Sequence, residues 1–414
     1  MALLTDVTPI AKRILIGNGF SALGSGLTMP FLVIYLGDVR GLGIALGGVI
    51  VAYIAVVSLF ATGPIGALVD RFGPRPVMII SLSITGVGIG CLAFVDSTPK
   101  AFAVATIIAI GEAGAWAPQS ALYARVTPSE HRQKIFGLQF MMLNLGLGVG
   151  GLVAALMVNV DEISTFSNLY LLDSMTFFIY VAILATLRGV GVGPSRDPDE
   201  PHLAGETKQG YRLISRDRAM RHLVLASLVL LIFGYGSLEV GLPIYATVIG
   251  SLDVSFLGVA FGVNTAVIVI GQLFVIRFLK GRSRSKAAGI VGLFWACAWF
   301  IVGISIEFES FIAGGLICLG VAIFAIGETF WSPVVPAIVN DLAPEHLRGR
   351  YNAVISLTWG LSGTVGPAFA GIMLGFDLPL LWLGAVVVGC LGSGLFLFRL
   401  RRLLTPAQDG MIST

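Results

Sequence analysis

Apolar stretches of roughly 20 residues recur along the whole chain, separated by short segments rich in charged residues, glycine and proline. About 20 helical residues cross the hydrocarbon core of a bilayer, so each stretch predicts one membrane-spanning helix. The predicted spans lie at residues 13–36, 44–69, 76–95, 101–123, 135–160, 169–187, 222–249, 254–279, 287–306, 311–339, 351–376 and 379–400. The pattern therefore predicts an all-α integral membrane protein with twelve transmembrane helices.

Composition and charge agree with this prediction and add an orientation. Of the 414 residues, 56% are hydrophobic and 12% are charged, whereas soluble domains carry about 25% charged residues. If the N-terminus is cytoplasmic, 24 of the 26 lysines and arginines fall in cytoplasmic segments, and only Arg40 and Lys100 lie outside. Cytoplasmic loops carry the excess of positive charge. We therefore expect a multi-pass protein of the cell (plasma or inner) membrane with both termini in the cytoplasm.

The longest polar segment divides the chain into two halves of six spans each. It predicts an N-terminal bundle at residues 1–188, a cytoplasmic linker at 189–220, a C-terminal bundle at 221–402 and a cytoplasmic tail at 403–414. Residues of the first half recur 216 positions later, with Gly111 and Glu112 as Gly327 and Glu328, Pro128 as Pro344, and Arg132 as Arg348. Repeats of this kind are common in transporters, so we expect two pseudo-symmetric six-helix bundles.

The turn after the second span carries a charged glycine motif, GALVDRFGPRP. Glycine lacks a Cβ, so this turn allows close helix approach and a tight bend. The aspartate is expected to lie against the positive N-terminal end of a neighbouring helix. The motif residues are Gly66, Asp70, Arg71, Gly73 and Arg75.

This motif resembles the G-x-L-x-D-R-x-G-R signature of the major facilitator superfamily. The resemblance implies the major facilitator fold, and it implies that Asp70 forms a cytoplasmic gate with the eleventh span near residues 348–351. The corresponding turn of the second half reads Val275 in place of the aspartate, so we expect a one-sided gate. The chain also resembles the drug/proton antiporters of this superfamily, because glycines and Pro367 occur together in the eleventh span. The fifth span lacks the proline of that element.

Three acidic residues, Glu112, Glu239 and Glu328, lie near the middle of the fourth, seventh and tenth predicted spans. An ionised acid at that depth costs at least ~2.5 kcal/mol, so each must face a cavity or be protonated. All basic residues and all four histidines lie in loops or at span ends. We therefore predict that these glutamates couple protons or bind substrate. The alternative is structural, a protonated acid bonded to a helix carbonyl or to an amide such as Asn144.

Polar and aromatic residues at similar depth are candidates for lining a cavity, although helix packing or interfacial anchoring is the favoured explanation for each of them taken singly. They are Asn18, Ser25, Trp116, Gln139 and Asn144 in the first half, and Tyr235, Asn264, Trp331 and Trp359 in the second. Asp173 falls near the start of the sixth predicted span, and we interpret it as an interfacial or helix-capping residue. The four cysteines lie in apolar stretches, and we expect no disulfide.

These observations favour a secondary active transporter, a proton-coupled exporter of small lipophilic or cationic compounds of the multidrug antiporter type. A proton-coupled importer of a nutrient or metabolite is the alternative, and a receptor or scaffold without transport is a third possibility. No phosphate-binding loop, nucleophile elbow or metal-spaced His or Cys pair occurs, so we expect neither an enzyme nor a metal site. We expect no cofactor, with the proton gradient as energy source. Expected partners are a small-molecule substrate and membrane lipid, with no nucleic acid and a monomeric state.

Overall fold

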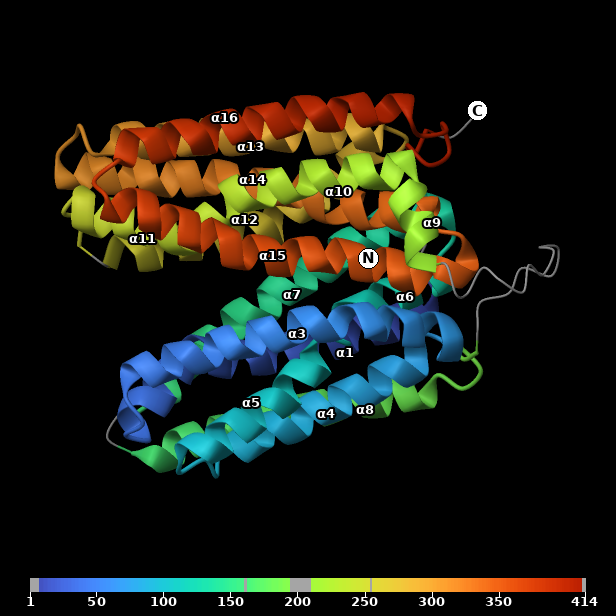
Figure 1. Ribbon diagram of the computed structural model, residues 1–414, viewed down its shortest axis with the longest axis horizontal. Coiled ribbons are helices and arrows are strands. Elements are labelled where there is room, and N and C mark those ends of the chain that lie inside the picture. The colour runs from blue at the N-terminus through green and yellow to red at the C-terminus, as the bar shows by residue number, and fades with distance from the viewer. Residues whose placement is uncertain (1–6, 160–161, 194–209, 254, 412–414) are drawn as a thin grey trace. The chain divides into compact units, whose positions relative to one another are not determined.

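Residues 7–159, 162–193, 210–253 and 255–411 are described by the computed structural model of the protein, and all their regular structure is helical (Figure 1). Twelve segments of these ranges are long and apolar enough to cross a membrane. They are Pro9–Val39, Ala45–Phe72, Pro74–Leu92, Thr98–Val126, Ser129–Met157, Ile163–Thr186, Arg218–Ile249, Phe256–Leu279, Arg284–Ser305, Ser310–Leu342, Glu345–Gly375 and Pro379–Arg402. The predicted all-α architecture with twelve spans is confirmed.

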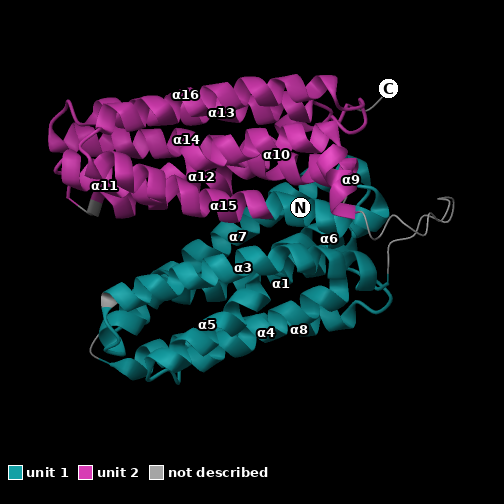
Figure 2. Ribbon diagram, viewed as in Figure 1, with its two compact units in different colours: residues 1–203, 343–356 teal, residues 204–342, 357–414 magenta. Residues whose placement is uncertain are grey.

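The chain forms two compact units, coloured separately in Figure 2. The first comprises residues 1–203 and 343–356, and the second comprises residues 204–342 and 357–414. The helix that begins at Arg348 therefore starts in the first unit and continues in the second. The domain limits drawn from the sequence stay a prediction, and residues 194–209 of the predicted linker lie outside the described residues.

The first unit contains seven main helices. They are α1 (Pro9–Thr28), α3 (Ile44–Phe72), α4 (Pro74–Leu92), α5 (Thr98–Glu112), α6 (Trp116–Val126), α7 (Ser129–Met157) and α8 (Ile163–Thr186). The second unit begins with α9 (Gly210–Arg216) and α10 (Arg218–Leu230), followed by α12 (Ser255–Leu279), α13 (Arg284–Ser305), α14 (Ser310–Leu342) and α16 (Pro379–Arg399). Helix α15 (Arg348–Gly375) spans the boundary between the units.

The same helix pairs pack in the two units, which is the structural expression of the sequence repeat. Helix α4 packs against α5 and α8, and its counterpart α13 packs against α14 and α16. Helix α3 packs against α5 in the same way as α12 packs against α14. Each unit is thus built from the same arrangement of spans, as two pseudo-symmetric bundles require.

Glycines allow two further helix contacts, α1 with α7 and the seventh span with α15, to be backbone to backbone. A Cβ at Gly150 of α7 would lie 2.1 Å from the carbonyl oxygen of Leu23 in α1. In the second unit, a Cβ at Gly366 would lie 2.6 Å from the Cα of Gly236. Gly150 and Gly366 are 216 residues apart, so the repeat register read from the sequence also holds for close helix packing.

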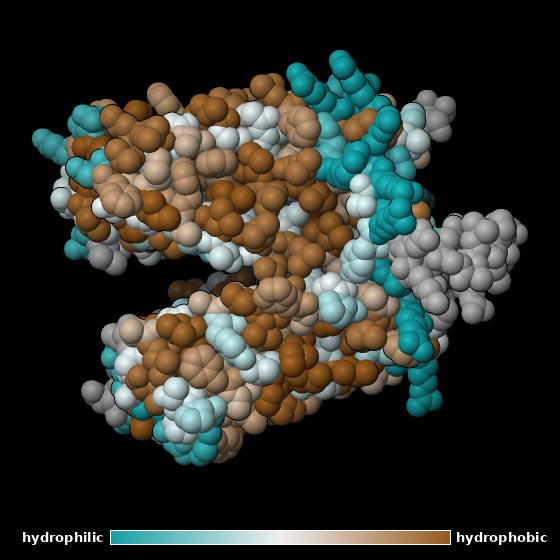
Figure 3. All heavy atoms as spheres, viewed as in Figure 1, coloured by the Kyte–Doolittle hydropathy of each residue, from teal (hydrophilic) through white to brown (hydrophobic). Residues whose placement is uncertain are grey.

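Large apolar side chains cover the outer surfaces of the helices, whereas hydrophilic residues gather at the helix ends of each unit (Figure 3). Phe60 is 76% exposed, Leu156 is 89% exposed and Phe311 is 84% exposed. A soluble protein rarely exposes continuous apolar surfaces of this kind, but a lipid-facing helix does. The surface therefore agrees with the spans found by length and composition.

The first, fourth and seventh spans depart from regular α-helix over more than a single terminal turn. The first span leaves α-helical geometry after Thr28, through the 3-10 turn Met29–Phe31 and the π-helical segment Tyr35–Val39. The fourth span is interrupted between α5 and α6, directly after Glu112. The seventh span continues from α10 as π-helical segments, among them Leu231–Tyr235 and Ser237–Gly241. Irregular backbone within a span occurs where other protein groups can satisfy it, and π-segments are frequent at functional sites.

Candidate functional site

Glu112 is the last residue of α5, at the break in the fourth span, and its side chain is exposed on the surface of the first unit. The break packs tightly on α4. A Cβ at Gly111 would lie 2.3 Å from the Thr85 hydroxyl, and one at Gly114 would lie 1.9 Å from the Ser81 hydroxyl. The local sequence G-E-A-G therefore ends the helix and presents the carboxyl group, because only glycine fits beside α4. Trp116, the first residue of α6, is 52% exposed.

Buried polar side chains of three helices of the first unit form a chain of hydrogen bonds that ends on the backbone of a fourth. The Gln119 side-chain amide donates to Asn18 Oδ1 (2.8 Å), and Asn18 Nδ2 donates to the backbone carbonyl oxygen of Gln139 (3.4 Å). The Tyr180 hydroxyl donates to Gln119 Oε1 (3.3 Å). Asn18 and Gln139 were both candidates, and the structure brings them together. Gln119 and Tyr180 were missed, although a glutamine inside an apolar span is itself a signal. Asn144, by contrast, donates to the Phe140 carbonyl oxygen of its own helix (3.0 Å).

Asp173 is completely buried and lies ten residues inside α8, so its interpretation as an interfacial or capping residue is wrong. The Thr28 hydroxyl donates to Asp173 Oδ2 at 2.6 Å, at the point where the first span leaves α-helical geometry. A Cβ at Gly24 would lie 2.3 Å from Asp173 Oδ1. The predicted sixth span begins at residue 169, whereas α8 begins at Ile163, so Asp173 lies deeper in the helix than the predicted span implies.

The buried carboxyl group of the second unit belongs to Glu328, which is 3% exposed on α14. Asn264 of α12 donates from Nδ2 to Glu328 Oε2 at 2.7 Å. Tyr235 of the seventh span lies next to the same carboxyl group. Three spans therefore meet at Glu328, and both of these neighbouring side chains are uncharged.

An aromatic cluster surrounds Tyr235. The ring of Trp359 stands edge-on to it, with centroids 4.9 Å apart, and the rings of Trp295 and Phe324 lie 6.1 and 5.9 Å away. Trp331 packs against Trp295 at 6.3 Å and is 4% exposed, whereas Trp359 is 38% exposed. Aromatic faces attract cations. The cluster thus places apolar rings and one carboxyl group together on the second unit.

Glu239 lies in the π-helical segment Ser237–Gly241 of the seventh span and is exposed on the second unit. It acts electrostatically on Tyr235, as Glu328 does. The second unit therefore holds two of the three candidate glutamates near one tyrosine, and Glu112 lies in the first unit.

The charged glycine motif lies where α3 ends and α4 begins. Asp70 accepts hydrogen bonds from the backbone N–H groups of Gly349 (2.6 Å) and Arg350 (3.3 Å) in the first turn of α15. The Arg350 guanidinium adds an ion pair at 3.0 Å, and the Asp70 side chain is 4% exposed. These partners lie within the stretch expected from the resemblance, residues 348–351. All of these residues belong to the first unit.

The remaining motif residues have separate positions. Gly73 has a φ of +90° and forms the turn. The carbonyl oxygen of Gly66 would lie 2.6 Å from a Cβ at Gly349, so the close approach depends on the glycine of α15. The side chain of Arg75 donates to the carbonyl oxygens of Leu184 (2.7 Å) and Ala185 (2.8 Å) at the end of α8.

Arg71 is exposed, and its guanidinium carbon lies 5.1 Å from the ring centroid of Phe72. Next to the motif, Val69, Asp70 and Pro74 line a small open pocket together with Arg125 and Arg348. Within the ranges that the structure describes, no group of three His, Cys, Asp or Glu residues could hold a metal ion, and the four cysteines are free.

Comparisons with known proteins agree with this geometry. Residues 14–367 match the model of the Major Facilitator Superfamily. The MFS-type transporter YhjO of Bacillus subtilis is 23% identical, with 86% of this chain and 84% of that protein covered. The class B tetracycline resistance protein of Escherichia coli is 23% identical, with 94% of each chain covered. Among solved structures, a bacterial homologue of the iron transporter ferroportin in an outward-facing state has a TM-score of 0.79, 12% identity, and coverage of 95% of this chain and 100% of that chain.

Proposed function

The chain belongs to the Major Facilitator Superfamily, and we propose that it is a secondary active transporter that exports small lipophilic or cationic compounds in exchange for protons. The family and its fold are those of membrane transporters and not of enzymes. On this proposal the protein works by alternating access as a multidrug-type antiporter. The proton gradient supplies the energy, and no cofactor takes part.

The proposal depends above all on the surroundings of Glu328. Its carboxyl group is buried in the spans of the second unit, and its neighbours Asn264 and Tyr235 carry no charge. A carboxylate in such a place is stable when it binds a proton or faces a cation. The adjacent rings of Tyr235 and Trp359 favour a cation that is also apolar. A group that binds either a proton or an organic cation can couple proton movement across the membrane to movement of the cation in the opposite direction.

Glu239 and Glu112 have supporting roles in this proposal. Both are exposed on their units, so protons and substrate can reach them more easily than Glu328. Glu239 would receive cations beside Tyr235, and Glu112 would carry protons in the first unit. The relative named for tetracycline resistance supports export of a small organic compound.

The direct test is transport in inside-out membrane vesicles, with ethidium as the lipophilic cation and an imposed proton gradient. We expect the wild type to accumulate ethidium and to release protons from the vesicle lumen. Glu328→Gln is expected to lower the initial rate at least about tenfold, because the side chain can no longer exchange a proton. Glu309→Gln removes an exposed acid between two spans and serves as the matched control.

Each possible result of this assay decides between the functions. Unchanged proton-coupled transport by Glu328→Gln would exclude the carboxylate mechanism. Ethidium movement that persists at full rate after the proton gradient is collapsed would exclude proton coupling. Proton-driven transport in the opposite direction would establish the importer alternative.

The location and state of the protein belong to the same proposal. We place it in the cell membrane as a monomer surrounded by lipid, with both termini in the cytoplasm and without a nucleic-acid partner. The excess of lysine and arginine on one side supports this orientation. Labelling of single cysteines introduced at residues 40 and 216 from outside intact cells would test it, because only the first should react.

A further inference from the structure

The chain that leaves the last helix of the second unit folds back onto the start of α13. Asp409 is 1% exposed, and its carboxyl group accepts hydrogen bonds from the Ser283 hydroxyl (2.6 Å) and the Ser285 backbone N–H (2.7 Å). Its carbonyl oxygen accepts the backbone N–H of Arg284 (2.8 Å). The first N–H groups of a helix have no partner within the helix. Asp409, from a distant part of the chain, provides the acceptors for two of these N–H groups at the start of α13.

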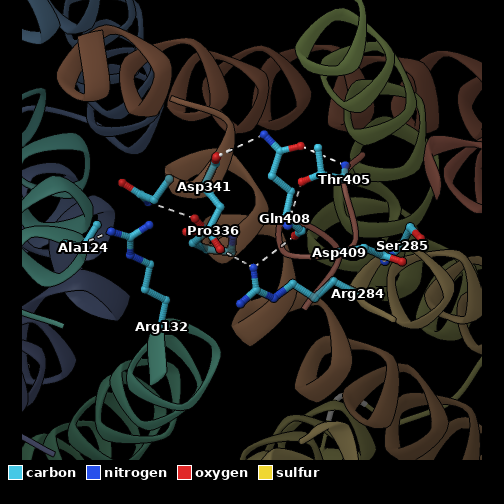
Figure 4. Close-up of polar contacts among 10 residues, drawn as sticks. Ala124, Arg132, Arg284, Ser285, Pro336, Asp341, Thr405, Gln408 and Asp409 are labelled. Atoms are coloured by element: carbon cyan, nitrogen blue, oxygen red, sulfur yellow. Dashed lines mark hydrogen bonds and ion pairs between the residues drawn. The ribbon is translucent and has the colours of Figure 1, made fainter. Parts of the chain in front are cut away.

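The side chain of Arg284 extends this contact to the end of α14 (Figure 4). Its guanidinium forms an ion pair with Asp341, and the two side chains are only 3% and 6% exposed. The same group donates to the Gln408 carbonyl oxygen (3.1 Å), and Gln408 Nε2 donates to the Asp341 carbonyl oxygen (3.4 Å). Removal of one member of such a buried ion pair leaves an uncompensated charge. The tail, α13 and α14 are thus held by one connected set of bonds.

The first unit contains a contact of the same kind where the chain leaves α8. The backbone N–H of Arg75, in the first turn of α4, donates to the Gly191 carbonyl oxygen at 3.1 Å. The Gly193 N–H donates to the Phe72 carbonyl oxygen at 2.9 Å. Arg125, near the end of α6, donates to the Gly193 carbonyl oxygen at 3.1 Å. A Cβ at Gly73 would lie 2.4 Å from the Gly191 carbonyl oxygen, so the motif glycine is what allows the approach.

The two contacts correspond element by element. In each, an arginine in the first turn of the third span gives its backbone N–H to the segment that follows the sixth span of that half. In each, a charged residue one position before the end of the fourth span of that half completes the contact, and these residues, Arg125 and Asp341, are 216 positions apart. The register is the one that relates Glu112 to Glu328.

We propose that these contacts are two copies of one conformational device, here called the exit clip, which fastens the segment leaving each bundle to the start of its third span and the end of its fourth. The exit clip comprises residues 184–193 with Arg75 and Arg125 in the first unit, and residues 405–411 with Arg284 and Asp341 in the second. It keeps these helix ends together as one body when the bundle moves. This role during movement of the bundle rests on the proposed transport function, whereas the contacts that form the exit clip do not depend on it.

The second clip is tested by hydrogen exchange of the purified full-length protein in detergent micelles. In Asp409→Ala the Ser285 N–H loses its acceptor, and we expect the peptide that covers residues 284–287 to exchange roughly two- to tenfold faster, the factor that one buried hydrogen bond provides. Glu309→Ala removes an exposed acid and should leave this peptide unchanged.

The first clip has a closer control. Gly73→Ala and Gly281→Ala both place alanine at a positive φ, +90° and +70°, in the turn between the second and third spans of a half. A Cβ at Gly281 meets nothing within 4 Å, whereas one at Gly73 meets backbone atoms of the exit segment. We expect faster exchange of the Arg75 and Gly193 amides in Gly73→Ala only. If that variant does not fold, Arg125→Gln takes its place, with the Gly193 amide as readout.

Equal exchange in each variant and its control would overturn the exit clip. A response in one unit alone would overturn the claim that the device is repeated. Because hydrogen exchange needs no substrate, failure of the ethidium assay leaves this test intact, and the two proposals can fail separately.

Discussion

The carboxyl group of Asp173 is held inside the first unit by hydroxyl groups. The Thr28 hydroxyl donates to it at 2.6 Å, and Thr176 lies at 3.4 Å on the same helix. Gly24 packs against it so closely that any side chain there would collide with Oδ1. Hydrogen bonds from hydroxyl donors stabilise a carboxyl group that has been removed from water.

At the scale of this residue we expect Asp173→Ala to lower the free energy of unfolding by about 1–3 kcal/mol, because the Thr28 hydroxyl loses its buried partner. Asp173→Asn keeps an acceptor of the same size, so it should lower the free energy of unfolding by clearly less than Asp173→Ala does. Thermal unfolding of the purified protein measures both. Asp96→Asn is the control, since Asp96 is exposed and its carboxyl group, whose pKa is lowered by the Lys100 ammonium, contributes little to stability. An Asn variant as unstable as the Ala variant would contradict the stabilising role of the hydrogen bond that Asp173 accepts from Thr28.

The fourth span carries both a helix break and a candidate glutamate, Glu112. Its repeat partner, α14, runs without interruption through Glu328, whereas the first half breaks between α5 and α6 directly after Glu112. The break contains a second glycine, Gly114, which packs against Ser81 of α4. The second half has Phe330 at the corresponding position, 216 residues later, and keeps its helix.

For this element we expect Gly114→Ala to destabilise the protein by about 1–3 kcal/mol, the usual cost of inserting atoms into a packed interior. The new Cβ would lie 1.9 Å from Ser81 Oγ and 2.6 Å from Ser81 Cβ. Adding Ser81→Gly to this variant removes both of these atoms. The double variant should regain much of the lost stability, as measured by thermal unfolding. Gly363→Ala, in a helix with nothing within 4 Å, is the control. No rescue by Ser81→Gly would show that the break does not depend on this contact.

At the scale of the whole molecule, helix α15 is shared by both units, because its first residues belong to the first unit and the rest belong to the second. Asp70 binds the first turn of this helix through two backbone N–H groups and the Arg350 side chain. A negative charge is favourable at the N-terminus of a helix. The contact therefore fixes where α15 starts within the first unit.

We expect Asp70→Asn to weaken this contact and to lower the initial rate of proton-driven ethidium transport roughly tenfold, because the start of α15 loses a charged partner worth up to ~2 kcal/mol. Faster hydrogen exchange at the Gly349 amide is the accompanying structural readout. Asp96→Asn makes the same chemical change at an exposed site and should alter neither. Loss of transport without any change in exchange at Gly349 would mean that Asp70 acts in another way.

The sequence by itself determined the features that follow from solvent and symmetry. Lipid requires long apolar helices, so hydropathy alone predicted twelve spans, and a shared register of 216 residues predicted two similar bundles. The resemblance of the motif to the major facilitator signature also indicated where the partner of Asp70 lies, in the first turn of α15. The sequence also identified Glu112, Glu239 and Glu328 as candidates, because an acidic residue in an apolar stretch can be recognised without knowing its spatial neighbours.

Only the tertiary structure decided which polar groups meet. The bonds of Asp173 to Thr28, of Asn264 to Glu328 and of Asp409 to the start of α13 join residues 145, 64 and 124 to 126 positions apart. No local pattern encodes such pairs, because they depend on helix rotation and on where each span breaks. Asp173, predicted as an interfacial acid, and Asp409, which lies in the predicted cytoplasmic tail, are therefore buried in the two bundles.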